Sequence, residues 1–408
     1  MQVLYKSCAG LDVHKDVIVA CARVGSGRKT QRSTESFPTH TAGLLALSEW
    51  LTSRGCTHVA MEATGVYWKP VWHILEGTFE LVLANASHIR NVPGRKSDVG
   101  DAEWIADLLA HGLIRSSFVP EQPVQELRDL TRTRKQLVRE MSQHTLRLQK
   151  VLEDANIKVT GLISDILGVS GRAILRAMID GESDPNALAQ LARGSLREKK
   201  TRLIDGLTGM VTPHHRFMLQ MHLKMVENIE AQLAEIDARI GGALEPFRHA
   251  VDLLKTIPGV GNLVAQVILA EMGADMSRFP TAGHLVSWAG LCPRSDESAG
   301  KRRSTRIRHG APWLKTTLVQ AAWAAARAKN SYLQAQYLRL KSRRGPKKAI
   351  IAVAASMLTA AFHMLRDQKP YVDLGSHHFD QVAKAHTVTR LVHRLTSLGY
   401  AVELKEAA

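Results

Sequence analysis

The sequence has few cysteines, and those it has are far apart. Its 408 residues include four, Cys8, Cys21, Cys56 and Cys292, and no two of them form a Cys-x-x-Cys pair. Scattered thiols exclude a small disulfide scaffold and a cysteine zinc site, and indicate reduced core residues. With 45% hydrophobic and 23% charged residues, the chain is not a disordered polymer, and it is long enough for two or three domains.

Long hydrophobic runs are also missing. The longest stretch without a charged residue spans 349–365, and alanines and three polar side chains make it weakly hydrophobic. A membrane span needs about 20 strongly apolar residues, so we expect a buried helix there instead. Residues 1–11 lack the charged-then-apolar pattern of a signal peptide. Together these features predict a soluble protein of the cytoplasm without a membrane partner.

Acidic residues are outnumbered by basic ones, and the excess lies in one part of the chain. Lys and Arg total 54 against 38 Asp and Glu, a net charge of +16. Residues 294–348 contain 15 of the basic residues and two acids, Asp296 and Glu297. Such an excess predicts a polyanionic partner, usually nucleic acid, whose phosphates the arginines would contact.

The first 115 residues alternate between strand and helix patterns. We predict strands at 9–13, 17–24, 58–61 and 79–84, and helices at 41–51, 66–75 and 98–113. A strand hairpin followed by strands that alternate with helices is typical of an α/β domain with a mixed sheet.

The next region shows heptad spacing instead. Apolar residues recur three and four apart in two stretches, 127–151 and 219–240. This spacing predicts an antiparallel or an intermolecular coiled coil, with two amphipathic helices of one globular bundle as the alternative. We therefore divide the chain into an α/β domain (1–115), a helical coiled-coil region (116–250), a mostly α-helical domain (251–370) and a tail of unknown role (371–408).

Four acidic residues lie in positions that suggest a shared site. Two are in apolar strands, where burying a carboxylate costs free energy, and two are at the start of a predicted helix. Asp12 and Glu62 lie in or at the end of apolar strands, where burial requires a partner or a cation. Asp98 and Asp101 are three apart at the start of a predicted helix, so they would share a face. Four carboxylates at one sheet edge suit paired Mg²⁺ ions, with Mn²⁺ as a substitute. Alternatively, the helix dipole alone favours Asp98 and Asp101 at a helix N-terminus, and Asp12 is a turn residue with its hydrogen bonds satisfied.

Three other acids, Asp16, Glu103 and Asp107, are off the face that Asp98 and Asp101 would share. We expect their side chains to face solvent.

The second half contains a glycine turn and a serine among arginines. Gly259 and Gly261 precede a helix, as in a helix-hairpin-helix element, where backbone N–H groups contact a DNA phosphate. Ser298 lies in a stretch expected to be a flexible loop between arginines, which suits phosphoryl transfer to a hydroxyl. The residues alone do not favour Ser298 over Ser295 or Ser304. The predicted nucleic-acid contacts are Gly259, Gly261, Arg294, Lys301, Arg302, Arg303, Arg306 and Arg308.

Several motifs occur together and in order. They are Gly-Leu-Asp-Val-His-Lys (10–15), Met-Glu-Ala-Thr-Gly (61–65), Lys-Ser-Asp-x-x-Asp-Ala (96–102), Leu-Leu-Ala (108–110), Ile-Pro-Gly-Val-Gly (257–261), Gly-Leu-x-Pro-Arg (290–294) and Ser-x-Gly (298–300). Over about residues 8–330 the chain resembles the DEDD transposases of bacterial insertion sequences, the insertion-sequence one-ten family. It departs from the expected pattern at Ala299, where glycine would follow the serine.

The resemblance implies a two-part active site. Asp12, Glu62, Asp98 and Asp101 match the metal-binding acids of an RNase H-like domain similar to RuvC-type Holliday-junction resolvases. Ser298 matches a nucleophile that links covalently to DNA. It also implies double-stranded DNA partners (element ends and target), a non-coding bridge RNA, a homo-oligomer such as a dimer or tetramer, and association with the nucleoid.

Three functions are therefore compared. The leading one is a recombinase that excises and inserts its own element through a covalent serine intermediate. The second is a metal-dependent junction endonuclease in which activated water attacks and Ser298 is structural. The third is a non-catalytic nucleic-acid scaffold with structural acids.

Overall fold

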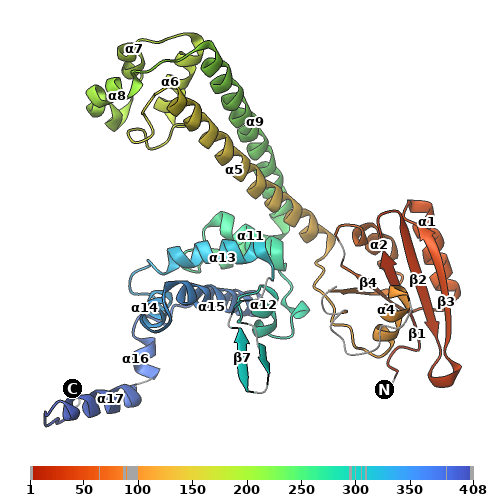
Figure 1. The fold of residues 1–408 in the computed structure, drawn as a ribbon. Helices are drawn as coiled ribbons and strands as arrows, with labels where there is room; N and C mark the ends of the chain where they lie inside the picture. The colour runs from red at the N-terminus through yellow and green to blue at the C-terminus, as the bar shows by residue number, and fades with distance from the viewer. Residues whose placement is uncertain are drawn as a thin grey trace. The chain divides into compact units, whose positions relative to one another are not determined.

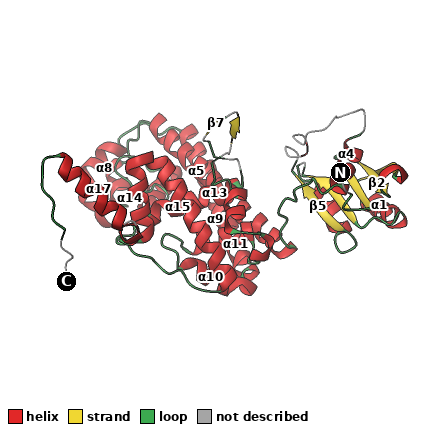
Figure 2. Cartoon of the chain, turned by 90° about the horizontal axis from the view of Figure 1, so that it is seen from below, coloured by secondary structure: helices red, strands yellow, loops and turns green. Residues whose placement is uncertain are grey.

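The computed structural model describes residues 3–63, 65–85, 89, 100–293, 296–298, 300–304, 306–307, 310–382 and 384–404. The chain forms two compact units, Met1–Val119 and Pro120–Ala408. The finer division of the second unit at residues 250 and 370 stays a prediction. Strands occur mainly in the first unit, and the second is almost entirely helical (Figure 2).

The first unit is built on a mixed sheet of five strands in the order β3-β2-β1-β4-β5. β1 pairs antiparallel with β2, and β2 with β3, whereas β1, β4 and β5 run parallel. The four predicted strands are confirmed, and β3 was missed. The strands are β1 (Ser7–Val13), β2 (Val17–Val24), β3 (Gln31–Pro38), β4 (His58–Glu62) and β5 (Glu80–Ala84).

Helices cover both faces of this sheet, because side chains alternate along each strand. Leu11 and Met61 pack with α1 (Thr41–Ser53) and α2 (Trp68–Leu75). Cys8 and Ala60 point to the other face, where they pack with α4 (Asp101–Ala110). Burial raises the pKa of the Cys8 thiol to about 12, so it stays protonated at neutral pH.

Ion pairs attach α4 to the two outer antiparallel strands. Arg23 of β2, whose side chain is 5% exposed, and Arg32 of β3 both donate to the Asp107 carboxylate, at 3.0 and 2.7 Å. The Thr34 hydroxyl donates to Glu103. The prediction that Asp107 and Glu103 face solvent is therefore wrong. Both acids are partly buried because β3, which the sequence did not reveal, brings partners to them.

Two long helices dominate the first part of the second unit, α5 (Gln122–Asp154) and α9 (Pro213–Ala243). Arg134 pairs with Asp237, His144 contacts His222, and Asp154 pairs with His215. As the residue number rises along α5, the number of its partner on α9 falls. The helices form an antiparallel pair within one chain (Figure 1), and the coiled-coil geometry of the pair stays a prediction.

The segment between these helices is a small lobe at the end of the pair (Figure 1). Its apolar side chains, such as Ile174, Leu175 and Leu203, share a core with Leu148 of α5 and Leu219 of α9. The lobe consists of α6 (Val169–Asp180), α7 (Pro185–Gln190), the 3-10 helix η2 (Gly194–Lys199) and α8 (Lys200–Leu207).

The rest of the second unit packs around α15 (Pro346–Asp367). This helix is long and apolar enough to cross a membrane by length and composition, yet 56% of its apolar window is buried in the fold. The predicted buried helix at 349–365 is confirmed. Its neighbours are α10 (Arg248–Lys255), α11 (Asn262–Met272), α12 (Ala282–Trp288), α13 (Pro312–Ala325) and α14 (Tyr332–Arg344). Among the described residues, short 3-10 helices also occur in the first unit at η1 (Gly27–Lys29) and in the second at η3 (Glu245–Phe247) and η4 (Met276–Arg278).

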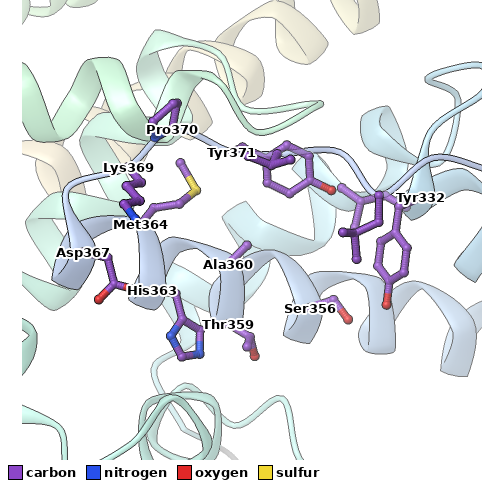
Figure 3. Close-up of a pocket in the computed structure, with 13 residues that line it drawn as sticks. Tyr332, Ser356, Thr359, Ala360, His363, Met364, Asp367, Lys369, Pro370 and Tyr371 are labelled. Atoms are coloured by element: carbon purple, nitrogen blue, oxygen red, sulfur yellow. The ribbon is translucent and has the colours of Figure 1, made fainter. Parts of the chain in front are cut away.

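The tail returns over α15 before it ends in α16 (His378–Val382) and α17 (Lys384–Ser397). The Tyr371 N–H donates to the Thr256 hydroxyl at 2.9 Å, and the Phe379 ring stacks on Tyr332. Between the returning segment, α14 and α15 lies an open, largely apolar cavity of about 390 Å³ (Figure 3). None of the predicted site residues that the structure describes lines this cavity.

Candidate functional site

Two of the predicted acids lie side by side at the carboxyl ends of parallel strands. The last paired residues of β1 and β4 are Leu11 and Met61, so Asp12 and Glu62 each follow immediately. Gly10 and Ala60 lie on the face of the sheet that α4 covers. Asp12 is two residues after Gly10, and Glu62 is two residues after Ala60. Asp12 and Glu62 therefore share that face as well.

The amino end of α4 reaches the same edge of the sheet. Gly10 lies so close to α4 that a Cβ atom there would be 2.3 Å from the Ala102 carbonyl oxygen. Further along α4, Ala106 contacts Cys8, and the Ala110 carbonyl accepts from the Leu4 N–H. The helix thus runs opposite to β1, and its first residue, Asp101, lies at the end where Asp12 and Glu62 stand. We call these three residues the acid edge.

The acid edge offers oxygen ligands that remain partly open to solvent. The Asp12 carboxylate is 25% exposed and lies 3.0 Å from His14 Nε2. Asp101 is exposed at the first position of α4. Within the described ranges, no three His, Cys, Asp or Glu side chains are close enough together to hold one metal ion. By chemistry the donor set fits Mg²⁺, which prefers carboxylate oxygens.

Asp98 lies outside the described residues. The helix predicted to start there begins at Asp101 instead, because Gly100 has a non-helical backbone (φ −53°, ψ 153°) and occupies the N-cap position. The predicted helix start is therefore wrong, while the expectation that Asp98 and Asp101 share one face stays a prediction.

Ser298 does not lie in a loop, as predicted, but ends a short strand. β6 (Asp296–Ser298) pairs antiparallel with β7 (Lys301–Ser304), and Ser298 is opposite Lys301. Gly300, with φ of +74°, belongs to the turn that follows. The hairpin could not be predicted from the sequence, because its strands contain no apolar residue and therefore show no alternation of apolar and polar residues. The hairpin places the serine backbone next to its tip, beside a basic strand (Figure 1, β7).

The structure divides the basic segment into separate groups. Lys301 and Arg306 are exposed at the hairpin, and Arg302 and Arg303 belong to β7. Arg294 and Arg308 lie outside the described residues. A second group surrounds the turn between α14 and α15, and no ion pair of the described residues involves it. Its exposed members are Lys341, Arg343, Arg344, Lys347 and Lys348.

The glycine turn joins α10 to α11. Gly259 has φ of +83°, and a Cβ atom there would be 2.5 Å from the Ala321 carbonyl oxygen of α13. This glycine is thus needed for close helix packing. Gly261, the N-cap residue of α11, is exposed and has open space around it. Of the two, Gly261 is the one placed to approach a ligand.

Two family models match the chain. The model of the DEDD transposases of IS110 matches residues 9–157, and the model described as "Transposase IS116/IS110/IS902 family" matches residues 251–338. The chain belongs to the IS110 family of transposases. The first model covers the acid edge, and the second covers the hairpin and the glycine turn of this IS110-family chain.

Curated relatives of this IS110-family chain are similar over different lengths. An uncharacterized 43.6 kDa protein of insertion element IS110 from Streptomyces coelicolor is 33% identical over 34% of each chain. The pilin gene-inverting protein of Moraxella bovis is 30% identical over 31% of this chain and 39% of its own length. An uncharacterized 42 kDa protein of IS900 from Mycobacterium paratuberculosis is 24% identical over 71% of this chain and 80% of its own. The chain thus spans little more than a third of the first two relatives.

Proposed function

We propose that this protein is a DNA recombinase that excises and inserts its own mobile element. Asp12, Glu62, Asp98 and Asp101 would hold Mg²⁺ in an RNase H-like domain, and Ser298 would be the nucleophile. The observation that carries the proposal is the meeting of Asp12, Glu62 and the amino end of α4 at one edge and on one face of the sheet. Family membership supports the same assignment.

The serine step conserves phosphodiester bonds. The Ser298 hydroxyl loses its proton, its oxygen bonds to a DNA phosphorus, and the bond from that phosphorus to a deoxyribose oxygen breaks. The released deoxyribose oxygen takes up a proton. Attack by the hydroxyl of another strand then reverses the step and frees the serine. Bound Mg²⁺ would neutralise charge on the phosphate, while Lys301 and its basic neighbours would hold the DNA backbone.

The partners follow from the same proposal. Double-stranded DNA, as element ends and target, would contact the basic hairpin, the group at the α14–α15 turn and Gly261 at the start of α11. A non-coding bridge RNA would select the DNA sites. The protein would act as a homo-oligomer, a dimer or a tetramer, in the cytoplasm at the nucleoid. The partly exposed apolar side chains of the helix pair, Met221 and Met225 among them, support self-association.

The proposal is tested by trapping a covalent intermediate. The protein is incubated with its flanking DNA in Mg²⁺, denatured and separated to detect protein linked to DNA. Wild type is compared with Ser298→Ala and Asp12→Ala. Two controls remove similar groups nearby: Asp16→Ala, an exposed acid in the β1–β2 turn, and Ser304→Ala in β7.

We expect an adduct in wild type and in both controls, and its loss in Ser298→Ala and Asp12→Ala. DNA cleavage that needs Asp12, forms no adduct and survives Ser298→Ala would contradict the serine step and favour the endonuclease. Absence of any metal-dependent cleavage, with DNA binding retained, would favour the scaffold.

A further inference from the structure

A row of basic side chains follows one face of α5, outside the basic segment of the sequence. Arg128, Arg132, Lys135 and Arg139 are four, three and four residues apart, which places them on one side of the helix. That side faces α11, which Arg128 contacts, and α13, which Lys135 contacts.

The first two of these residues have structural partners. Arg132 donates two hydrogen bonds of 2.8 Å to the carboxylate of Glu271, which is completely buried near the end of α11. Arg128 donates to the backbone carbonyls of Ala270 and Glu271. One buried negative charge is thus held by two guanidinium groups, and this half of the row serves to join α5 to α11.

The second half of the row has no such compensation. Lys135 Nζ donates to the neutral hydroxyl of Thr316 at 2.7 Å, and no ion pair of the described residues includes Lys135 or Arg139. Burial and the nearby Arg139 lower the pKa of Lys135, and the opposing attraction of Glu271 does not offset them. Two positive charges, one partly buried and one exposed, therefore stand beside each other on α5.

These cations surround an aromatic ring on the first turn of α13. The centroid of the half-buried Trp313 ring lies 5.4 Å from the Arg139 guanidinium, 5.6 Å from Lys135 Nζ and 5.8 Å from the Arg132 guanidinium. Cations beside an aromatic platform are the combination that proteins use to hold unpaired nucleotides, with phosphates on the cations and a base on the ring.

We infer that Lys135, Arg139 and Trp313 form a second nucleic-acid site that binds an unpaired strand through its phosphodiester backbone and a stacked base. The inference rests on the proposed function in that it assumes a nucleic-acid partner. It adds a site on α5 and α13 that contains no residue of the hairpin or the glycine turn. The strand can be DNA opened during recombination or a single-stranded part of an RNA, and both present the same phosphates and bases.

The test measures binding, not cleavage. Full-length protein is titrated into fluorescein-labelled single-stranded DNA of about 20 nucleotides, longer than a typical site, and into RNA of the same sequence, at several salt concentrations. Lys135→Gln/Arg139→Gln is compared with Arg147→Gln/Lys150→Gln. The control removes the same charge from two exposed residues of the same helix, which form no ion pair among the described residues.

We expect the first variant to bind about tenfold more weakly and its log–log salt slope to fall by about 1.4, for two lost phosphate contacts. The control should stay within about twofold of wild type, because its charges lie away from Trp313. Trp313→Leu should also weaken binding about tenfold, and Trp313→Phe should bind like wild type. The probe with the larger loss identifies the strand as DNA or RNA.

Equal losses in the two double variants, or no loss in the first, would overturn the inference while leaving the proposed function intact. Failure of the wild type to bind either single-stranded probe would also overturn the inference, whereas the proposed function would fail only if no covalent adduct formed with double-stranded DNA. If the first double variant does not fold by circular dichroism, the exposed single substitution Arg139→Gln decides on the same criteria.

Discussion

The acid edge and the hairpin hold their reactive groups in different ways. Asp12 and Glu62 end buried parallel strands, and Gly10 lets α4 press its backbone against β1 beside them. Ser298 ends a three-residue strand whose pairing is interrupted by an irregularity between Asp296 and Glu297. A rigid sheet thus fixes the acids, whereas the serine depends on a short two-stranded ribbon. The comparison indicates that the position of the acids depends on side-chain packing in a core, whereas that of the Ser298 backbone depends on strand pairing.

The largest effect should come from removing the buried charge of the second unit. Glu271→Ala leaves Arg128 and Arg132 without their carboxylate, which should lower the opening free energy of α11 by about 4 kcal/mol. Hydrogen exchange measured by mass spectrometry over α5 and α11 checks this. Peptides of the first unit should be unchanged, and Glu235→Ala, an exposed acid on α9, should have no effect. An equal increase in hydrogen exchange in both units would contradict the claim that Glu271 stabilises only the second unit.

A slightly smaller effect is expected in the first unit for Gly10→Ala. The added Cβ would lie 2.3 Å from the Ala102 carbonyl oxygen, so α4 must move, at a cost of about 3 kcal/mol. The acid edge would then be displaced and the DNA adduct lost. Gly100→Ala, where a Cβ atom meets nothing within 4 Å, serves as the control and should cost less than about 1 kcal/mol. An intact adduct in Gly10→Ala would show that α4 does not position the acids.

Asp107→Asn should have an intermediate effect on the same unit. It removes the charge that neutralises Arg23, which is nearly buried, and Arg32. We expect a loss of about 2 kcal/mol in stability, measured by urea unfolding with probes on β2 and β3. Asp16→Asn, in an exposed turn, is the matched control. Retained stability in Asp107→Asn would mean that apolar packing alone holds α4.

The smallest effect is a pH dependence of the helix pair. Burial, His144 and Arg147 lower the pKa of His222 below 6.5, so near that pH the unfolded chain binds a proton that the folded chain excludes. Stability is therefore full above pH 6.5 and falls as the pH drops below it, by at most about 1.4 kcal/mol per pH unit. Urea unfolding at several pH values should show this slope in wild type and a reduced slope in His222→Gln. An unchanged slope would assign the dependence to other groups.

The sequence predicted elements whose apolar residues follow a clear period. The four predicted strands and the antiparallel helix pair are of this kind. It did not reveal β3, which is an edge strand with one buried side chain, Phe37, among polar residues. Nor did it reveal the hairpin of β6 and β7, which is held by backbone hydrogen bonds and contains no apolar residue. Backbone pairing without side-chain burial leaves no periodic signal.

The candidate site followed the same rule. Asp12 and Glu62 could be placed together because each follows an apolar strand, and the carboxyl ends of parallel strands meet. The role of Asp107 depended on β3 and was therefore missed. The row Arg128, Arg132, Lys135 and Arg139 was visible as a spacing of four, three and four, but only the neighbouring α11 and α13 show which of these charges are compensated.

The central claim is that Ser298 becomes linked to DNA in a reaction that requires the acid edge. The most direct measurement is to isolate the DNA adduct, digest it with trypsin and nuclease, and find the modified peptide by mass spectrometry. We predict a phosphonucleotide on Ser298 in peptide 295–301 of the wild type and none in Asp12→Ala. A nucleotide on Ser295, on Ser304 or on any other residue, or an adduct that survives Asp12→Ala, would contradict the account.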